Sequence, residues 1–152
     1  MRLFNLVSGM VLALTLLGCS NKDKGNSCTT AAEDDAKMQK YITDNGVSAT
    51  KHASGLYYQV IEPGTGETPT INSTVKAKYV GTYTNKTSFD SNETSFQLRG
   101  VIPGWQIGIP LIKQGGKIKL IIPPYLAYGC NDYQGIPGNS VLVFDVELLE
   151  VN

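Results

Sequence analysis

Apolar and polar residues alternate most regularly near the C-terminal end of the chain. Positions 142, 144, 146 and 148 are Leu, Phe, Val and Leu, whereas Asp145 and Glu147 lie between them. Side chains at alternate positions of a β-strand point to the same face. The pattern therefore predicts a strand over residues 142–148 that buries one wholly apolar row.

Shorter alternating runs predict further strands earlier in the chain. They cover residues 56–61, 75–79 and 118–122, and Phe96 with Leu98 indicates a short additional strand. Between these runs, residues 104–112 form the one candidate helix of this region, which Pro110 should truncate. The expected fold class is α+β: an antiparallel sheet of about five strands wrapped over one short helix.

A different periodicity precedes the strands. Within residues 31–45, Met38, Tyr41 and Ile42 are spaced as one face of an amphipathic helix, acidic residues occupy its first turn, and Gly46 follows its end. We predict a helical extension and linker over residues 31–53, placed before a main domain at 54–152.

The first eighteen residues are typical of a targeting segment. Arg2 precedes an apolar run that is too short to span a bilayer. The run ends in L-L-G-C, which resembles the lipobox of bacterial lipoproteins, so we expect a signal peptide at residues 1–18 and acylation, for example with palmitate, at Cys19. An ordinary secretory signal with a chance cysteine is the alternative. Residues 19–30 are polar and small, as in a flexible tether.

Composition limits the chemistry that can be expected. Thirteen basic residues balance thirteen acidic ones, which gives no electrostatic reason to bind nucleic acid. The only histidine, His52, lies outside any nucleophile motif, so a serine triad has no support. No His or Cys pair has metal-ligand spacing. We therefore expect neither a metal nor a cofactor.

The only tryptophan, Trp105, ends the sequence V-I-P-G-W, in which a Pro-Gly pair places a large ring at a helix entrance. A core position is the alternative for any lone tryptophan. Together with V-K-A-K-Y-V-G-T-Y, F-D-S, L-A-Y-G and V-L-V-F-D-V-E-L-L, in this order, the segment resembles the FKBP-type peptidyl-prolyl isomerases over about residues 54–150. The preceding helix and lipobox are similar to lipoprotein members from Bacteroidetes-like bacteria.

The resemblance implies a proline-binding pocket. It assigns catalytic roles to Asp90, Tyr128 and Phe144, and it assigns substrate binding to Tyr79, Phe89, Val101, Ile102, Trp105 and Ile136. The Ile102 backbone N–H and the Tyr128 hydroxyl would bond carbonyl groups of the peptide. Taken singly, Tyr79 or Phe144 could be a core residue and Asp90 a turn aspartate, and only the joint pattern favours the functional interpretation.

The sequence also departs from the family pattern. The segment S-N-E-T-S after Asp90 is interpreted as a short loop without the usual arginine, and an outer pocket aromatic is expected to be replaced near Thr94, which would leave a shallower rim. In the loop 129–136, Asp132 and Tyr133 are the candidates for a position that is usually histidine.

The expected function is catalysis of X-Pro bond rotation in proline-containing, unfolded or partly folded polypeptides. The expected location is outside the cytoplasm, on a bacterial membrane and most simply the outer one. A non-catalytic peptide-binding module or holdase is the alternative, and macrolide inhibitors of the FKBP family are plausible ligands. Because exported thiols tend to be oxidised and Cys19 would be acylated, Cys28 and Cys130 are the candidates for a disulfide.

Overall fold

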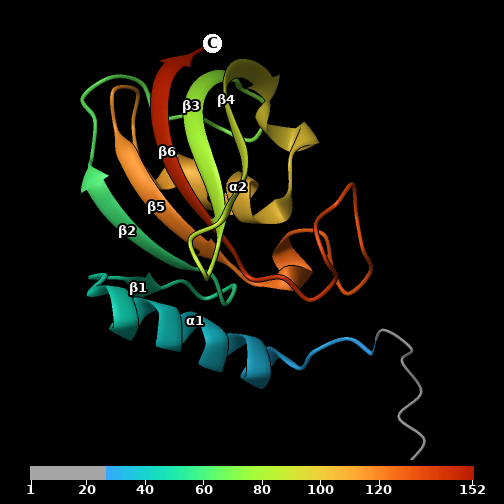
Figure 1. Cartoon of the computed structure of the whole chain (residues 1–152). Helices are drawn as coiled ribbons and strands as arrows, with labels where there is room; N and C mark the ends of the chain where they lie inside the picture. The colour runs from blue at the N-terminus through green and yellow to red at the C-terminus, as the bar shows by residue number, and fades with distance from the viewer. Residues whose placement is uncertain (1–26) are drawn as a thin grey trace, which may run out of the picture.

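The computed structural model describes residues 27–152 and contains one six-stranded sheet (Figure 1). All paired strands are antiparallel, in the order β1-β2-β5-β6-β3-β4. Their bounds are Thr50–Lys51 (β1), Tyr57–Glu62 (β2), Thr74–Tyr83 (β3), Ser88–Gln97 (β4), Lys117–Ile122 (β5) and Leu142–Val151 (β6). With a short helix against this sheet and an N-terminal helix, the predicted α+β class is confirmed.

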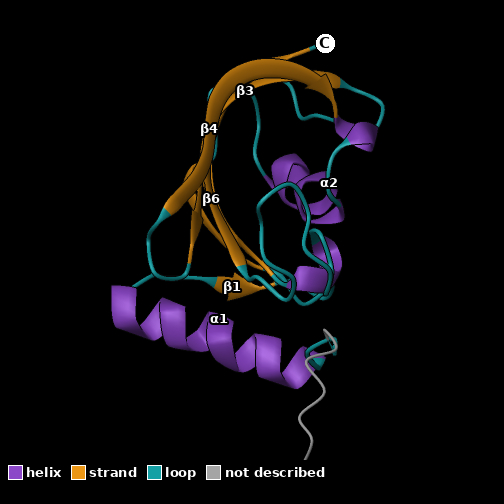
Figure 2. Ribbon diagram, turned by 45° about the vertical axis from the view of Figure 1, so that its right-hand side comes forward, coloured by secondary structure: helices purple, strands orange, loops and turns teal. Residues whose placement is uncertain are grey.

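Helix α2 (Pro103–Gly108) lies against the concave face of the curved sheet (Figure 2). The apolar rows of β5 and β6 point toward it, so the side chains of Leu120, Phe144 and Leu148 are almost fully buried. This cluster is the main core. Pro110 does shorten the helix as expected, because α2 ends at Gly108 and a 3-10 turn, Ile109–Leu111, follows.

Helix α1 (Ala31–Asn45) covers part of the opposite face of the sheet (Figure 2). Its start is a capping box, in which the Thr30 hydroxyl accepts from the Glu33 N–H and the Glu33 carboxylate accepts from the Thr30 N–H. Met38 and Tyr41 bury their side chains in a second apolar cluster that includes Ile121. The N-terminal extension is therefore packed on the main domain.

Strand β4 differs from the sequence interpretation. The segment S-N-E-T-S is not a loop, because Ser88–Gln97 pairs with β3 along its length. The strand is also longer than predicted, and Leu98 belongs to the 3-10 turn Leu98–Gly100 that follows it. Its side chains are mostly exposed and polar. Such a strand, at the edge of a sheet, is held by backbone pairing and shows little of the apolar alternation that identifies a half-buried strand.

The short strand β1 lies in the segment that we expected to be a linker, which raises the strand number from about five to six. The predicted signal peptide and the acylated Cys19 lie outside the described residues. Within residues 27–152, no helix is long and apolar enough to cross a membrane.

Candidate active site

A cavity of about 550 Å³ opens on the concave side of the sheet. Its lining comes from three strands, helix α2 and the segments beside them. The lining residues are Tyr79, Asp90, Thr94, Phe96, Gly100, Val101, Ile102, Trp105, Tyr128, Tyr133 and Phe144. Six of these side chains are aromatic, so the cavity offers ring faces and edges with few charged groups.

Trp105 is the centre of the aromatic lining. Its side chain is only 5% exposed, and the rings of Tyr79, Phe96 and Phe144 surround it at centroid distances of 4.9, 5.3 and 5.1 Å. Tyr79 and Phe144 meet it edge to face, the arrangement that aromatic quadrupoles favour. The indole Nε1 is the one buried side-chain polar atom without a hydrogen-bond partner in residues 27–152.

The wall formed by Phe144 depends on a glycine of β3. Gly81 pairs with Phe144 on one side and with Asp90 on the other. A Cβ at Gly81 would lie 2.7 Å from Phe89 Cζ and 2.8 Å from Phe144 Cε1, so no other residue leaves room for the two rings. The register between β3 and β4 shifts beside Gly81, and such bulges re-aim side chains. The side chains of Phe89 and Asp90, although consecutive in the strand, thereby both lie on the concave side of the sheet.

Asp90 is held at the rim by a hydrogen bond. The Tyr79 hydroxyl donates to Asp90 Oδ2 at 2.8 Å. Partial burial, followed by this bond to the carboxylate, raises the pKa of Tyr79 to about 12. The phenol therefore stays protonated at neutral pH and keeps donating to the carboxylate.

The segment Val101–Ile102 is fixed from helix α2. Gln106 donates its Nε2 to the Val101 carbonyl at 2.7 Å and to the Arg99 carbonyl at 3.3 Å. Ile102 is the N-cap of α2, so its N–H lies outside the helix's own hydrogen bonds. The arrangement suits a backbone donor for a bound carbonyl group. The sequence interpretation missed Gln106, whose position one residue after Trp105 was the only available signal.

Tyr128 and Tyr133 form another part of the cavity lining. Their rings are stacked at a centroid distance of 4.7 Å with planes only 10° apart. Burial raises the pKa of Tyr128, so its hydroxyl is protonated at neutral pH and can donate. Tyr133, one of two candidates for the family's histidine position, is thereby placed in the pocket lining, whereas Asp132 accepts from the Gly138 N–H.

Most of the residues that the resemblance assigned lie together, but two pack behind the lining. Phe89 contacts Phe144 at a centroid distance of 5.6 Å, and Ile136 packs against the main core. Phe96 was not assigned, although it lines the cavity two residues after Thr94. Thr94 itself lines the cavity without an aromatic ring, as expected, but Phe96 of the same strand supplies a ring that the sequence interpretation did not assign to the pocket. Alternation along a strand places Thr94 and Phe96 on one face.

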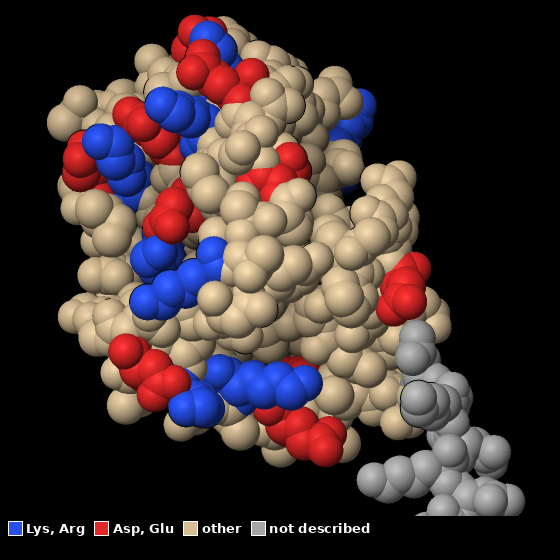
Figure 3. All heavy atoms as spheres, in the orientation of Figure 1, with Lys and Arg blue, Asp and Glu red and all other residues tan. Residues whose placement is uncertain are grey.

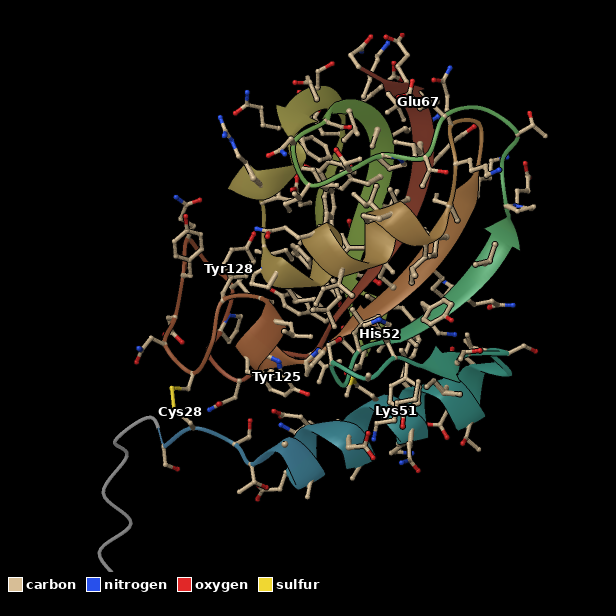
Figure 4. All side chains as sticks on the ribbon, turned by 180° about the vertical axis from the view of Figure 1, so that it is seen from behind. Cys28, Lys51, His52, Glu67, Tyr125 and Tyr128 are labelled. Carbon is tan, nitrogen blue, oxygen red and sulfur yellow. A yellow bond between two sulfur atoms is a disulfide. The ribbon has the colours of Figure 1, made fainter. Side chains whose placement is uncertain are left out.

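The disulfide candidates are bonded in the structure. The Cys28 and Cys130 sulfur atoms are 2.09 Å apart, which ties the segment before α1 to the loop after Tyr128 (Figure 4). His52 is not among the residues that line the cavity, and its Nδ1 bonds Ser54 before the start of β2. Within residues 27–152, no three His, Cys, Asp or Glu side chains gather as metal ligands.

Charged side chains are interspersed on the face shown in Figure 3. Among the described residues, several charged side chains are paired across neighbouring strands, for example Lys119 with Asp145 and Lys117 with Glu62. Surface pairs of this kind contribute little to stability. Basic and acidic groups alternate over this face instead of forming a field of one sign.

Comparison with known proteins agrees with this geometry. The family model described as FKBP-type peptidyl-prolyl cis-trans isomerase matches residues 65–149. FkpA of Escherichia coli is 49% identical over 130 residues, which cover 80% of this chain and 47% of FkpA. The crystal structure of that FkpA aligns with a TM-score of 0.72 at 47% identity, over 80% of this chain and 61% of the other.

A second solved structure extends the comparison. A peptidyl-prolyl cis-trans isomerase from Pseudomonas syringae aligns with a TM-score of 0.69 at 27% identity, over 83% of this chain and 98% of the other. The chain belongs to the FKBP-type peptidyl-prolyl cis-trans isomerase family. It spans about half the length of the curated relatives it matches, such as FkpA.

Proposed function

We propose that the protein is a peptidyl-prolyl cis-trans isomerase that accelerates X-Pro bond rotation in unfolded or partly folded polypeptides. The observation that carries this proposal is the aromatic cavity of about 550 Å³ around Trp105, which is lined by seven of the nine residues that the family resemblance assigned. Family membership supports the same reaction.

Rotation about the X-Pro bond requires a site that fits the prolyl ring and excludes water, and it requires no nucleophile. Rotation breaks no covalent bond, but the amide must give up its resonance, at a barrier of about 18–20 kcal/mol. Trp105 would form the floor for the prolyl ring, with Tyr79 and Phe144 as walls. Apolar walls exclude water, which would hydrogen-bond the carbonyl oxygen and stabilise the planar amide.

Two donors would hold the peptide on either side of the rotating bond. Ile102 and Tyr128 both line the cavity, and they offer a backbone N–H and a hydroxyl as donors. Asp90, fixed by Tyr79, would place a carboxylate beside the twisting amide. Donors that bond the twisted form better than the planar one lower the barrier.

A non-catalytic peptide-binding module is the second candidate. The supporting observation is that much of the rim is exposed, with Tyr133 46% exposed and Asp90 on an exposed edge strand. A protease-coupled cis/trans assay on short X-Pro peptides separates the two functions. Turnover above the uncatalysed rate supports the isomerase, whereas saturable peptide binding without turnover would leave only the binding module.

We infer that the protein is exported and anchored to a membrane, most simply the outer one, through a lipid on Cys19. The lipobox-like L-L-G-C supports this, as does the Cys28–Cys130 disulfide, since such bonds persist in oxidising compartments. Because a single acyl chain anchors only marginally, several chains on one residue would be needed for stable attachment.

Cys19→Ala tests the anchor. The variant should leave the detergent phase in a phase-partition experiment, whereas Cys28→Ala should stay with the wild type because its cysteine lies in the folded part. Equal partitioning of Cys19→Ala and the wild type into detergent would rule out acylation at this residue.

Macrolide inhibitors of the family are proposed ligands of the same cavity. A macrolide that fills the aromatic cavity should compete with X-Pro peptides and quench Trp105, which is the only tryptophan of the chain. Quenching without competition would place the macrolide elsewhere.

A further inference from the structure

The loop Gly129–Asn139 carries part of the pocket but has little support from the core. Residues 131–135 are all exposed, and Ile136 is the loop's partly buried hydrophobic residue against the main core cluster. Tyr133 nevertheless lies flat on Tyr128 and lines the cavity. Something other than core packing must therefore hold the loop in place.

Within the loop, a tight hairpin presents Tyr133. The Tyr133 N–H donates to the Ile136 carbonyl at 2.9 Å, and the Ile136 N–H donates back at 2.8 Å. Gln134 and Gly135 between them have φ of 46° and 86°, both positive, as in a type I′ turn. The hairpin sets the direction of the tyrosine ring relative to the rest of the loop.

At its base, the loop closes on itself. The Asn139 N–H donates to the Gly129 carbonyl at 3.0 Å. Gly138 passes so close to Cys130 that a Cβ would lie 2.1 Å from the Cys130 carbonyl oxygen. The two ends of the loop are thus side by side, so contacts with these ends fix the position of the whole loop.

Residues Ser27–Thr29 are bonded to both ends of the loop. Cys28 is bonded to Cys130 at the start of the loop. At its end, Asn139 Oδ1 accepts from the Thr29 N–H at 2.9 Å, and Asn139 Nδ2 donates to the Ser27 carbonyl at 3.0 Å. Figure 4 shows the disulfide at the foot of the loop, on the same side of the molecule as Tyr128.

Thr29 is in turn hydrogen-bonded to helix α1. The Thr29 hydroxyl donates to Asp34 Oδ1 at 2.7 Å, and the polar side chain of Asp34 is only 1% exposed. Buried polar groups of this kind are expensive unless they are hydrogen-bonded, so the contact fixes Thr29 to the helix. Met38 in turn packs α1 onto the sheet.

We propose that residues Ser27–Thr29 form a clasp that belongs to the substrate site, and that Tyr133 is a positioning residue which this clasp holds over Tyr128. The proposal deepens the proposed function, on which it rests, because the stack fixes the ring whose hydroxyl would bond the peptide. Substrate affinity then depends on a segment that lies about a hundred residues earlier in the chain.

The first test changes the stack. Tyr133→Ala should raise KM for a short X-Pro peptide about two- to tenfold, the range that corresponds to one aromatic pair, with kcat nearly unchanged. Tyr133→Phe, which keeps the ring, should restore the wild-type KM. The matched control is Tyr125→Ala, because Tyr125 is also exposed, at 48%, but bonds the Ser54 carbonyl away from the cavity.

A spectroscopic readout separates positioning from general damage. In protein with labelled tyrosines, the Tyr128 ring resonance should lose the ring-current shift of its stacked neighbour in Tyr133→Ala and keep it in Tyr133→Phe. An unchanged KM and an unchanged Tyr128 resonance in Tyr133→Ala would overturn the positioning role. A defect of equal size in Tyr133→Phe would overturn it as well, because the hydroxyl and not the stack would then matter.

The second test opens the clasp. Asn139→Gly deletes the side chain that bonds Ser27 and Thr29, while glycine still adopts the φ of 61° found at Asn139. Cys28→Ser with Cys130→Ser removes the covalent part. Each variant should raise KM within the same range and move the Tyr128 resonance as Tyr133→Ala does. Asn139→Gly keeps the test valid if the cysteine variant fails to fold.

Combination with Tyr133→Ala decides whether clasp and stack act as one unit. If the clasp works through the stack, Asn139→Gly should add little to a protein that already lacks Tyr133. If the increase in KM of the double variant equals the product of the increases in the two single variants, the clasp does not act through the stack, and the proposal is overturned. If the wild type shows no turnover, the proposed function fails, and the clasp is then judged by the peptide dissociation constant and by the Tyr128 resonance alone.

Discussion

Individual residues of the pocket have two kinds of task, and the structure separates them. Trp105 is buried among three rings and shapes the floor, whereas Tyr128 is half-buried and offers a hydroxyl to the cavity. Removing a ring that shapes the pocket and removing a single hydrogen bond to the peptide should cost different amounts of binding free energy. Substitution can therefore distinguish a pocket that works by enclosure from one that works by proton transfer.

The first prediction compares Tyr128→Phe with Trp105→Ala. A typical hydrogen bond contributes about 0.5–1.5 kcal/mol, so Tyr128→Phe should weaken peptide binding about tenfold at most and should retain turnover. Trp105→Ala should lose most turnover, because it removes the floor. Both are measured in the cis/trans assay.

Folding must be checked first by circular dichroism, since truncating a buried tryptophan costs about 3–5 kcal/mol. Trp105→Phe is the milder substitute if the alanine variant unfolds. Complete loss of turnover in Tyr128→Phe, with near-normal turnover in the tryptophan variant, would refute the enclosure mechanism.

The second prediction uses the raised pKa of Tyr79. An unfolded tyrosine ionises near pH 10, whereas in the folded protein the pKa is about 12. Between these values the unfolded state releases a proton that the folded state retains, so the free energy of unfolding should fall as pH rises from 10 to 12. The contribution is complete below pH 10.

Tyr79→Phe should reduce the slope of that fall, measured by urea unfolding at pH 9, 10 and 11. Other groups with raised pKa values, such as Tyr128 and the paired lysines Lys51, Lys76 and Lys117, contribute to the remaining slope. An identical slope in Tyr79→Phe and the wild type would show that Tyr79 ionises normally.

At the scale of single elements, helix α2 owes its position to glycine. A Cβ on Gly104 would lie 2.5 Å from Cγ2 of Ile122 in β5, and one on Gly108 would lie 2.5 Å from Cδ2 of Leu120. The helix therefore sits closer to the sheet than any side chain would permit. This close approach sets the depth at which Trp105 enters the cavity.

The third prediction is that Gly104→Ala destabilises the protein. Alanine improves helix propensity by at most about 1 kcal/mol, but overpacking a core costs about 1–3 kcal/mol, and the β-branched, fully buried Ile122 has little freedom to move. Denaturant unfolding measures the difference.

Gly100→Ala is the matched control, because no atom lies within 4 Å of a Cβ at Gly100. It should leave the free energy of unfolding nearly unchanged. A Gly104→Ala variant that is as stable as Gly100→Ala would show that α2 can move away from β5 without cost.

At the scale of the whole molecule, the N-terminal extension is part of the folded body. Helix α1 shares an apolar cluster with β2, β5 and the start of β6, and the Cys28–Cys130 disulfide links segments 102 residues apart. Cross-links that close long loops restrict the unfolded chain most strongly in the chain-entropy model.

The fourth prediction is a loss of stability when Cys28 and Cys130 are both replaced by serine. The model gives a limit of about 4–5 kcal/mol for a loop of this length, and strain or residual structure in the unfolded chain would lower the value. Urea unfolding of oxidised wild type and variant measures it.

Thiol titration of unfolded, non-reduced protein from its native compartment provides the control. It should find neither cysteine free. Two reactive thiols would contradict the disulfide, whatever the unfolding experiment shows.

Much of the architecture was already determined by local patterns. The spacing of Met38 and Tyr41, with Gly46 after them, predicted helix α1 over the residues that form it, and the alternation at 142–148 predicted the first seven residues of β6. These features succeed because a helix or a half-buried strand leaves its own period in the sequence. The family motifs predicted seven residues of the cavity lining.

Tertiary structure alone decided the remaining features. Strand β4 is held by backbone pairing with β3 and therefore needs few apolar residues, so its composition resembles that of a turn. Phe96 lines the pocket because it belongs to this strand. The cysteine count pointed to the Cys28–Cys130 link, but the hydrogen bonds of Asn139 with Ser27 and Thr29 leave no signal in the sequence. Local sequence encodes which face a residue shows, but the meeting of two distant segments depends on how the whole chain packs between them.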